Sequence, residues 1–367
     1  MAKKGTCGIC INKCFPGAIS VVNLPSPETG GLLVHSYGEN GFRFFGVPQI
    51  TPGKIIGLLG VNGIGKSTLL EILAGKKLPN GGNFQHPEKG SQEFLSQLTI
   101  ASFRQFISEM TKKRLTVGYK PQVFSELMSD DISIQQILSG SYQEGLFSKD
   151  EVIKLMELEA ILDRCPRELS GGELQRLAIG IVLLQNVDVY LIDEPCTFLD
   201  FRQRIKMAEI FRKLAAAGKV VFIAEHDIAI HDFQSDLIYL FYGKSHKFGV
   251  MSRLSYSVKK GINNFLLGRL KDENIRIRNK EIIFTRVVKE RQWEGVPGID
   301  YPTFQKKLGS FTLTATKGII HFGEILCVLG ENGLGKTTFA QYLSNTLQHV
   351  RISYKPQFLH RKFAGTV

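Results

Sequence analysis

The stretch GLLGVNGIGKSTLLEILAG, residues 57–75, decides the fold. It passes from an apolar run through a glycine-rich turn into a segment with a 3.6-residue apolar period, which predicts a strand, a loop and a helix in that order. Residues Gly60 to Ser67 fit the pattern G-x-x-x-x-G-K-[ST], in which backbone N–H groups and a helix N-terminus surround phosphate groups. The sequence therefore predicts a phosphate-binding loop on an α/β scaffold.

Each position of this loop has an expected contact. The Lys66 ammonium is expected to hold the β- and γ-phosphates of a nucleotide, and the Ser67 hydroxyl to hold Mg²⁺. The predicted nucleotide contacts of this loop are Gly60, Asn62, Gly63, Gly65, Lys66, Ser67 and Thr68.

The same pattern occurs a second time, as CVLGENGLGKTTFAQYLSN at residues 327–345. Each copy is preceded by an apolar run that predicts a strand, IIGLLG at 55–60 and EILCVLG at 324–330. The repeat continues downstream, because VGYKPQ at 117–122 returns as ISYKPQ at 352–357. Two nucleotide-binding domains are therefore predicted, and the second copy adds Gly330, Asn332, Gly333, Gly335, Lys336, Thr337 and Thr338 as contacts, with Thr337 also on Mg²⁺.

An apolar strand that ends in two carboxylates completes the first copy. In VDVYLIDEP, residues 187–195, Asp193 is expected to orient Mg²⁺ through water, and Glu194 to activate the attacking water as a general base. Alone, this segment also fits a strand that ends in a polar helix start. The matching phosphate loop favours the catalytic interpretation.

At LSGGELQR, residues 169–176, the sequence resembles the signature motif of ATP-binding-cassette ATPases. The resemblance implies that Ser170, Gly171, Gly172 and Glu173 face the γ-phosphate of a nucleotide held by another cassette. It implies further roles for Gln122 and Gln357 as Q-loop residues, for Gln122 on Mg²⁺, for Leu199 and Asp200 in the D-loop, and for His226 as the switch histidine. An aromatic ring before the phosphate loop is expected to stack on adenine, and Tyr37 and Phe42 both remain open for this position.

Charge and composition narrow the class of protein. The 367 residues carry a net charge of +12, and residues 244–310 hold fifteen Lys or Arg against six Asp or Glu, a net charge of +9. Such a stretch attracts polyanions such as RNA, although a solvated basic face without a partner remains the alternative. No apolar run of about 18 residues and no secretion signal is found, so a cytoplasmic protein without a membrane partner is expected.

Two further segments resemble one family within this class: the N-terminal residues 7–25 and the basic linker, residues 244–278. CGICINKCFPGAISVVNLP at 7–25 is similar to the end of a ferredoxin-type cluster run, and SVKKGIN at 257–263 with ENIRIR at 273–278 resembles the hinge of the ribosome-recycling ATPase, or RNase L inhibitor, family. The resemblance implies two head-to-tail cassettes that close around ATP and Mg²⁺ and split the ribosome. The implied partners are the small ribosomal subunit with its rRNA and translation termination or initiation factors.

The predicted architecture is an α/β P-loop cassette, with a mixed or parallel sheet and a helical subdomain, followed by part of a second cassette. The expected domains are a ferredoxin-like remnant at 1–27, a first cassette at 28–245, a hinge at 246–295 and the opening of a second cassette at 296–367.

The chain departs from the family pattern at both ends. The family carries eight cysteines for two [4Fe–4S] clusters, whereas this N-terminus offers Cys7, Cys10 and Cys14, an incomplete ligand set. After Gln357 no second signature, acidic strand end or switch histidine follows. We therefore expect a fragment of a longer product, or a chain whose first cassettes complement each other as a pair. The alternatives are a module that binds nucleotide without hydrolysis and, third, a transporter ATPase subunit.

Overall fold

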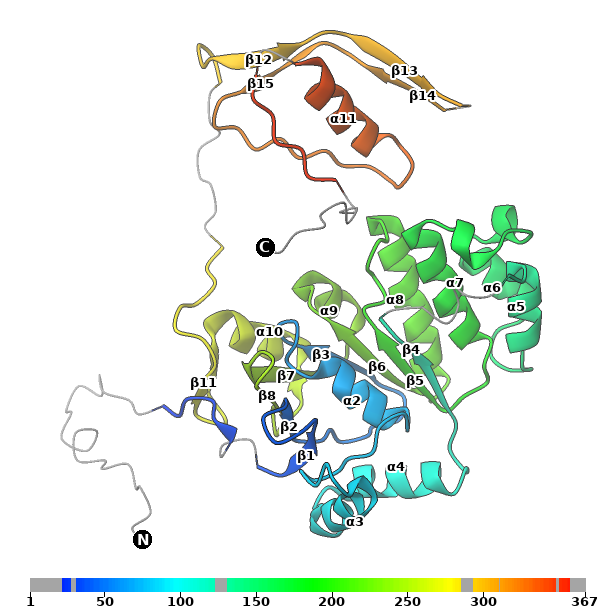
Figure 1. The fold of residues 1–367 in the computed structure, drawn as a ribbon, viewed down its shortest axis with the longest axis vertical. Coiled ribbons are helices and arrows are strands. Elements are labelled where there is room, and N and C mark those ends of the chain that lie inside the picture. The colour runs from blue at the N-terminus through cyan, green and yellow to red at the C-terminus, as the bar shows by residue number, and fades with distance from the viewer. Residues whose placement is uncertain are drawn as a thin grey trace, which may run out of the picture. The chain divides into compact units, whose positions relative to one another are not determined.

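The computed structural model describes residues 22–27, 31–122, 131–284, 293–309, 311–347 and 350–356, which form two compact units. Unit 1 runs to Leu199 and includes Gln203–Phe284, and unit 2 comprises Asp200–Arg202 and the residues from Thr285 onward (Figure 1). Among the described residues, no helix is long and apolar enough to cross a bilayer.

A twisted mixed sheet forms the centre of unit 1. Its described strands lie in the order β1-β2-β8-β7-β3-β6-β5-β4, with β9 paired to β7. The pairs β7–β3, β3–β6, β6–β5 and β5–β4 are parallel, whereas β1–β2, β7–β8 and β7–β9 are antiparallel. The strands are β1 (Leu33–Ser36), β2 (Arg43–Phe45), β3 (Ile55–Leu59), β4 (Val117–Lys120), β5 (Val189–Asp193), β6 (Val220–Glu225), β7 (Leu237–Lys244), β8 (Phe248–Met251) and β9 (Tyr256–Ser257).

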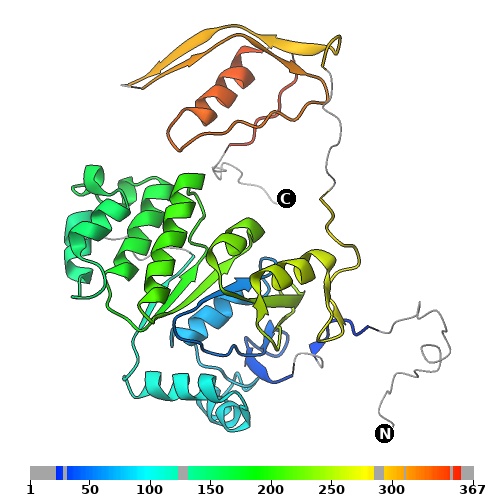
Figure 2. The same ribbon diagram turned by 180° about the vertical axis from the view of Figure 1, so that it is seen from behind.

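Helices cover both faces of the parallel strands, because successive side chains along each strand point to opposite faces. Ile55, Tyr190 and Val221 pack in one core with α5 (Ile134–Ser141), α6 (Lys149–Leu155), α7 (Gly171–Leu183) and α8 (Phe201–Ala216). Their neighbours Ile56, Leu191 and Phe222 pack in the opposite core with α2 (Lys66–Leu73), α3 (Pro87–Gln97) and α4 (Ala101–Thr111). The green helices α5 to α8 and the cyan helices α3 and α4 lie on opposite sides of the sheet in both views (Figures 1 and 2). The predicted α/β cassette fold is confirmed.

A third apolar cluster joins the basic linker to the sheet. It packs α10 (Val258–Leu267), β10 (Arg269–Leu270) and β11 (Ile275–Arg276) with β7 and β8, and α9 (Ile228–Gln234) lies alongside α10. Residues 246–284 therefore pack within unit 1. The four domain boundaries given above remain a prediction.

Unit 2 contains β12 (Gly298–Tyr301), β13 (Phe304–Leu308), β14 (Phe311–Ala315), β15 (Gly318–His321) and α11 (Lys336–Thr346). β12 pairs with β15 and β13 with β14, both antiparallel. The Phe304 ring stacks on Phe339 and Tyr342 of α11, at centroid distances of 5.9 and 3.5 Å. Aromatic contacts thus hold the helix of the second phosphate loop onto this unit.

The strand predicted at 324–330 does not form. Residues 324–330 have no strand structure, and the side chains of Ile325 and Leu329 are each 91% exposed. In the first copy, β3 is fully buried because β6 and β7 pair with it on either side. The described residues after α11 contain no strand that could do the same, so the backbone of 324–330 lacks hydrogen-bond partners from a sheet.

Candidate nucleotide-binding site

The first phosphate loop lies between the end of β3 and the start of α2. Gly63 and Gly65 have φ of 71° and 106°, the left-handed region that favours glycine. A Cβ on Gly65 would also lie 2.9 Å from Cδ2 of Phe44, so space as well as backbone conformation requires glycine here. The second loop repeats this backbone, because Gly333 and Gly335 have φ of 81° and 84°.

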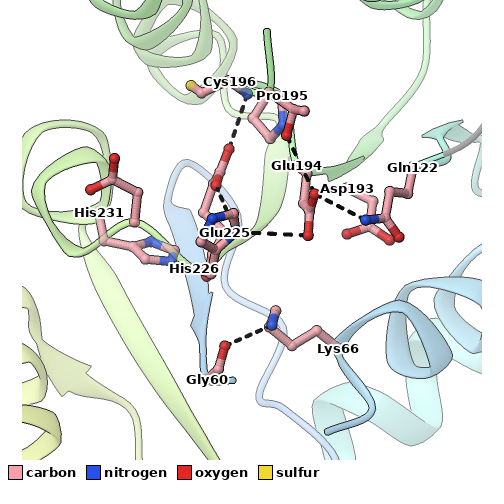
Figure 3. Close-up of polar contacts among 12 residues, drawn as sticks. Gly60, Lys66, Gln122, Asp193, Glu194, Pro195, Cys196, Glu225, His226 and His231 are labelled. Carbon is pink, nitrogen blue, oxygen red and sulfur yellow. Dashed lines mark hydrogen bonds and ion pairs between the residues drawn. The ribbon is translucent and has the colours of Figure 1, made fainter. Parts of the chain in front are cut away.

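The loop lysines fold back onto their own loops. Lys66 Nζ donates to the Gly60 carbonyl at 2.7 Å (Figure 3). It also donates to the Val61 carbonyl at 3.1 Å. Lys336 Nζ makes the equivalent bonds to Gly330 at 2.7 Å and to the next carbonyl at 2.6 Å. Burial lowers the pKa of Lys66, although the carboxylates of Asp193 and Glu194 oppose the shift. An anion in the loop would therefore compensate a buried ammonium.

The two carboxylates reach the loop because β5, β6 and β3 are adjacent parallel strands, whose carboxyl ends share one edge of the sheet. Asp193 is 2% exposed, and burial raises its pKa, against hydrogen bonding by Ser67 and the charge of Lys120. Its Oδ2 is buried without a hydrogen-bond partner in the described part of the chain. An orphaned carboxylate oxygen beside a hydroxyl suits a hydrated divalent cation, so the residues present fit Mg²⁺.

Glu194 directly follows β5 and is 9% exposed. Its Oε2 accepts hydrogen bonds from Gln122 Nε2 at 3.0 Å and from Thr197 Oγ1 at 3.3 Å. The switch residue His226, which follows β6, places Nδ1 3.8 Å from Glu194 Oε1 and 4.0 Å from Glu225 Oε2. Figure 3 shows Gln122, Glu194 and His226 on the opposite side of the site from Lys66.

One cavity of about 360 Å³ gathers most of the contacts predicted for the site at the first phosphate loop. Gly60 and His226 do not line it, although Gly60 binds Lys66 and His226 lies beside Glu194. The lining residues are Tyr37, Phe42, Asn62, Gly63, Gly65, Lys66, Ser67, Thr68, Gln122, Asp193, Glu194 and His246.

Both aromatic candidates for the base line this cavity. The Tyr37 hydroxyl hydrogen-bonds Thr68 Oγ1 at 3.1 Å and accepts from Lys77 Nζ at 3.0 Å, and the two rings of Tyr37 and Phe42 lie 6.4 Å apart. Phe42 instead lies against Gly65, where its Cζ would be 3.1 Å from a Cβ. The choice between the two rings stays open.

The signature segment caps a helix. The Ser170 hydroxyl accepts from the backbone N–H of Glu173 at 3.4 Å, and the Glu173 carboxylate accepts from the Ser170 N–H at 2.8 Å and from its hydroxyl at 2.7 Å. This capping box begins α7 at Gly171. Ser170, Gly171, Gly172 and Glu173 do not line the cavity, so their contact with another cassette's nucleotide remains a prediction.

Several predicted residues lie outside the described part of the chain. They are Cys7, Cys10 and Cys14 of the predicted cluster run and Gln357 of the second Q-loop. The described residues contain no group of three or more side chains that could hold a metal ion in the usual His, Cys, Asp or Glu combination.

The sequence predictions missed His246. It lies in the β7–β8 turn, where the His246 N–H donates to the Gly63 carbonyl at 3.2 Å and the Ser245 hydroxyl to the Asn62 carbonyl at 3.1 Å. The imidazole lies so close to Gly63 that a Cβ there would meet Cε1 at 2.9 Å. No motif signals this residue, because a contact across roughly 180 positions depends on sheet order. The positive φ of 62° at His246 marks a tight turn in the structure only.

A mixed sheet with a phosphate loop and an acidic strand end, together with the signature segment LSGGELQR at the start of α7, defines an ATP-binding cassette. A family model described as "ABC transporter" matches residues 48–197. Translation initiation factor RLI1 of Chaetomium thermophilum is 36% identical over 375 residues, covering 98% of this chain and 61% of that protein. ABC transporter E family member 3 of Arabidopsis thaliana is 35% identical over 184 residues, covering 49% of this chain and 88% of that protein.

A solved structure gives the same relationship. The structure described as "Model of ribosome-bound archaeal Pelota and ABCE1" matches with a TM-score of 0.79 at 36% identity, over 98% of this chain and 61% of that chain. The chain belongs to the E family of ATP-binding-cassette proteins, which confirms the resemblance drawn from the motifs. It spans about three fifths of the length of the RLI1 relative that it matches.

Proposed function

We propose that the chain binds ATP with Mg²⁺ at its first phosphate loop and hydrolyses it there, with Glu194 as general base. The observation that carries the proposal is the single cavity that gathers Lys66, Ser67, Gln122, Asp193 and Glu194. The Lys66 ammonium leaves the carbonyls of its loop to bind the β- and γ-phosphates. The loop N–H groups and the start of α2 hold the remaining phosphate charge.

The proposed metal ligands are Ser67, Gln122 and, through water, Asp193. Mg²⁺, when bound, neutralises phosphate charge. The Gln122 amide nitrogen already donates to Glu194 at 3.0 Å, so its amide oxygen is the atom left for the metal. In the second loop, Thr337 takes the position of Ser67.

The proton transfer falls to Glu194. Its Oε2 is engaged by Gln122 and Thr197, whereas Oε1 lies toward His226. Glu194 Oε1 is therefore the oxygen that accepts a proton from the attacking water, and His226 lies beside it to contact the γ-phosphate. Ser170 and the first turn of α7 act on a nucleotide held by a second cassette, with Leu199 and Asp200 as D-loop residues.

The family membership supports a role on the ribosome. One relative is described as a translation initiation factor, and one solved structure as ribosome-bound. We infer that ATP binding and hydrolysis drive splitting of ribosomal subunits in the cytoplasm, with the small subunit and its rRNA as partner and with termination or initiation factors taking part. Binding without hydrolysis is the second candidate. The observation in its favour is that the strand expected before the second phosphate loop, at 324–330, does not form.

The basic linker offers the surface for rRNA. A cavity of about 630 Å³ is lined by Arg269, Arg276, Arg278 and Lys280, together with Val22, Leu267, Asn279, Glu281 and Ile283. The Arg278 side chain stabilises the fold, because its guanidinium donates to the carbonyls of Phe265 at 2.6 Å and Leu266 at 2.7 Å. Lys280 is exposed and is the better candidate for a phosphate contact.

Co-sedimentation with small ribosomal subunits over a range of salt concentrations tests this role. Binding is expected to weaken linearly on a log–log plot, and Lys280→Ala to lower the slope by about one. Lys54→Ala, an exposed lysine before β3, is the control and should leave the slope unchanged. Binding that is independent of salt, or no binding at all, would count against rRNA as the partner.

The iron–sulfur cluster is a separate proposal. Cys7, Cys10 and Cys14 supply three cysteine ligands at most, and a [4Fe–4S] cluster takes four, so a cluster here requires an outside ligand. Iron and acid-labile sulfide measured after anaerobic purification decide between a loaded and an empty segment.

A further inference from the structure

Glu194 occupies a backbone conformation that a non-glycine residue rarely adopts. Its φ is 47°, in the left-handed region, where the Cβ of a non-glycine residue crowds the following carbonyl oxygen. Such a conformation persists only when the surrounding groups hold it. The direction of the Glu194 side chain, and therefore the position of its carboxylate in the cavity, depends on those groups.

Two buried side chains hold the carbonyl groups of this turn. Lys120 Nζ donates to the Asp193 carbonyl at 2.5 Å and to the Glu194 carbonyl at 3.2 Å. Gln175 Nε2 donates to the Glu194 carbonyl at 2.7 Å and to the Pro195 carbonyl at 2.8 Å. The Glu194 N–H donates to the Ala224 carbonyl of β6 at 2.9 Å. The turn is therefore fixed from β4, from α7 and from β6.

Lys120 is an unusual group to find in this place. It is 1% exposed at the end of β4, next to Ile192 in the pairing of β4 with β5. Burying an ammonium is costly unless its hydrogens are bonded, and here carbonyl oxygens bond it. Burial lowers the pKa of Lys120 to about 8, with Asp193, Glu225, Glu194 and Cys196 opposing the shift. A neutral amine still carries two N–H groups, so both carbonyls stay bonded if the proton leaves.

The repeated motif shows that the sequence around Lys120 does not itself bury a lysine. The residues YKPQ occur at 119–122 and again at 354–357. Lys355, the equivalent of Lys120, is exposed. Lys120 is buried because the turn after β5 lies against it and offers two carbonyl groups.

We infer that Lys120, assisted by Gln175, is a positioning residue that holds the strained backbone of Glu194 and thereby aims its carboxylate. Lys120 does not line the cavity, so its effect on the site is exerted through the backbone of Glu194. The inference rests on the proposed function in one respect, that the Glu194 carboxylate acts on water. The claim that Lys120 and Gln175 hold the backbone of Glu194 does not depend on whether the chain hydrolyses ATP.

Lys120→Met in the full chain tests the backbone part, because Met keeps the length of the side chain and removes the donors. Amide hydrogen exchange in peptides that span 190–197 is expected to become faster, since the Glu194 N–H bond to Ala224 loses its support. Lys355→Met is the matched control and should leave this exchange unchanged. Gln175→Leu removes the other two bonds and should also speed exchange, which keeps the test open if one variant folds poorly.

Steady-state ATP hydrolysis gives the second readout. Lys120→Met is expected to lower kcat roughly tenfold to a hundredfold with KM changed less than about twofold, because a misplaced base affects chemistry more than binding. In a Glu194→Gln background, Lys120→Met should have no further effect on turnover. Unchanged exchange at 190–197 in a folded Lys120→Met chain overturns the inference, as does unchanged kcat in a chain whose wild type turns over. A wild type without turnover overturns the proposed hydrolysis instead, and hydrogen exchange then decides the inference.

Discussion

At the residue scale, the site contains buried ionisable groups whose charged forms are destabilised by burial unless a ligand compensates them. Lys66 is buried with a lowered pKa, and its ammonium donates to the carbonyls of Gly60 and Val61 in its own loop. Asp193 has a raised pKa and an oxygen without a partner in the described part of the chain. A polyphosphate with its cation compensates both residues, which is the physical reason for assigning nucleotide binding to this cavity.

His246 gives a prediction at the same scale. His246→Gly removes the imidazole from the cavity wall, and it keeps a backbone that glycine adopts more readily at φ 62°. We expect ATP affinity to fall roughly threefold to tenfold, about 1 kcal/mol, since one side-chain contact with the nucleotide is lost. Thermal stability should hold or rise. The measurement is ATP affinity by calorimetry.

Lys247→Ala is the control for the same turn, because Lys247 is exposed and absent from the cavity lining. Equal affinities for wild type and His246→Gly would show that the imidazole makes no contact with the nucleotide.

At the element scale, the connection from β6 to α9 is held by a buried neutral histidine. His231 is fully buried, with Nε2 3.1 Å from the Glu225 carbonyl and Nδ1 3.1 Å from Ser235 Oγ. Burial lowers its pKa to about 4, against the hydrogen bond to Glu225. This ring supports the strand end that carries the switch residue His226.

The lowered pKa predicts acid destabilisation of unit 1. His231 binds a proton near pH 6.5 in the unfolded chain and only near pH 4 in the folded chain. The contribution of neutral His231 to the free energy of unfolding is therefore fully present above pH 6.5 and is lost as the pH falls toward 4. The loss amounts to roughly 3 kcal/mol at most. Urea unfolding at pH 7, 5.5 and 4.5 measures it. In His231→Gln the free energy of unfolding should fall less between pH 7 and pH 4.5 than in the wild type. An equal fall in both chains would mean that other groups cause the acid destabilisation.

Sequence patterns predicted elements well where local signals and tertiary partners agree. The strand, loop and helix at 55–73 formed as predicted, because β6 and β7 flank the strand. The equally apolar run at 324–330 did not form a strand, since no described strand pairs with it. Apolar character alone predicts burial, whereas a strand also needs hydrogen-bond partners.

At the scale of the whole molecule, sheet order decides which residues meet. The predictions found Lys66, Asp193 and Glu194 because each lies in a motif with a known chemical role. They missed His246 and the role of Lys120, because a hairpin turn reaches the loop across the sheet and a lysine is buried by a turn about 73 residues away. The topology supplies those contacts, and no local pattern records them.

The central claim is that unit 1 holds a catalytic nucleotide site with Glu194 as its base. The most direct measurement is phosphate release from ATP by the wild-type chain and by Glu194→Gln, with ATP affinity measured for both. We predict that Glu194→Gln lowers kcat by about a hundredfold or more, as expected for loss of a general base, while ATP affinity changes less than about twofold. Equal rates in the two chains, whether near zero or substantial, would contradict the account.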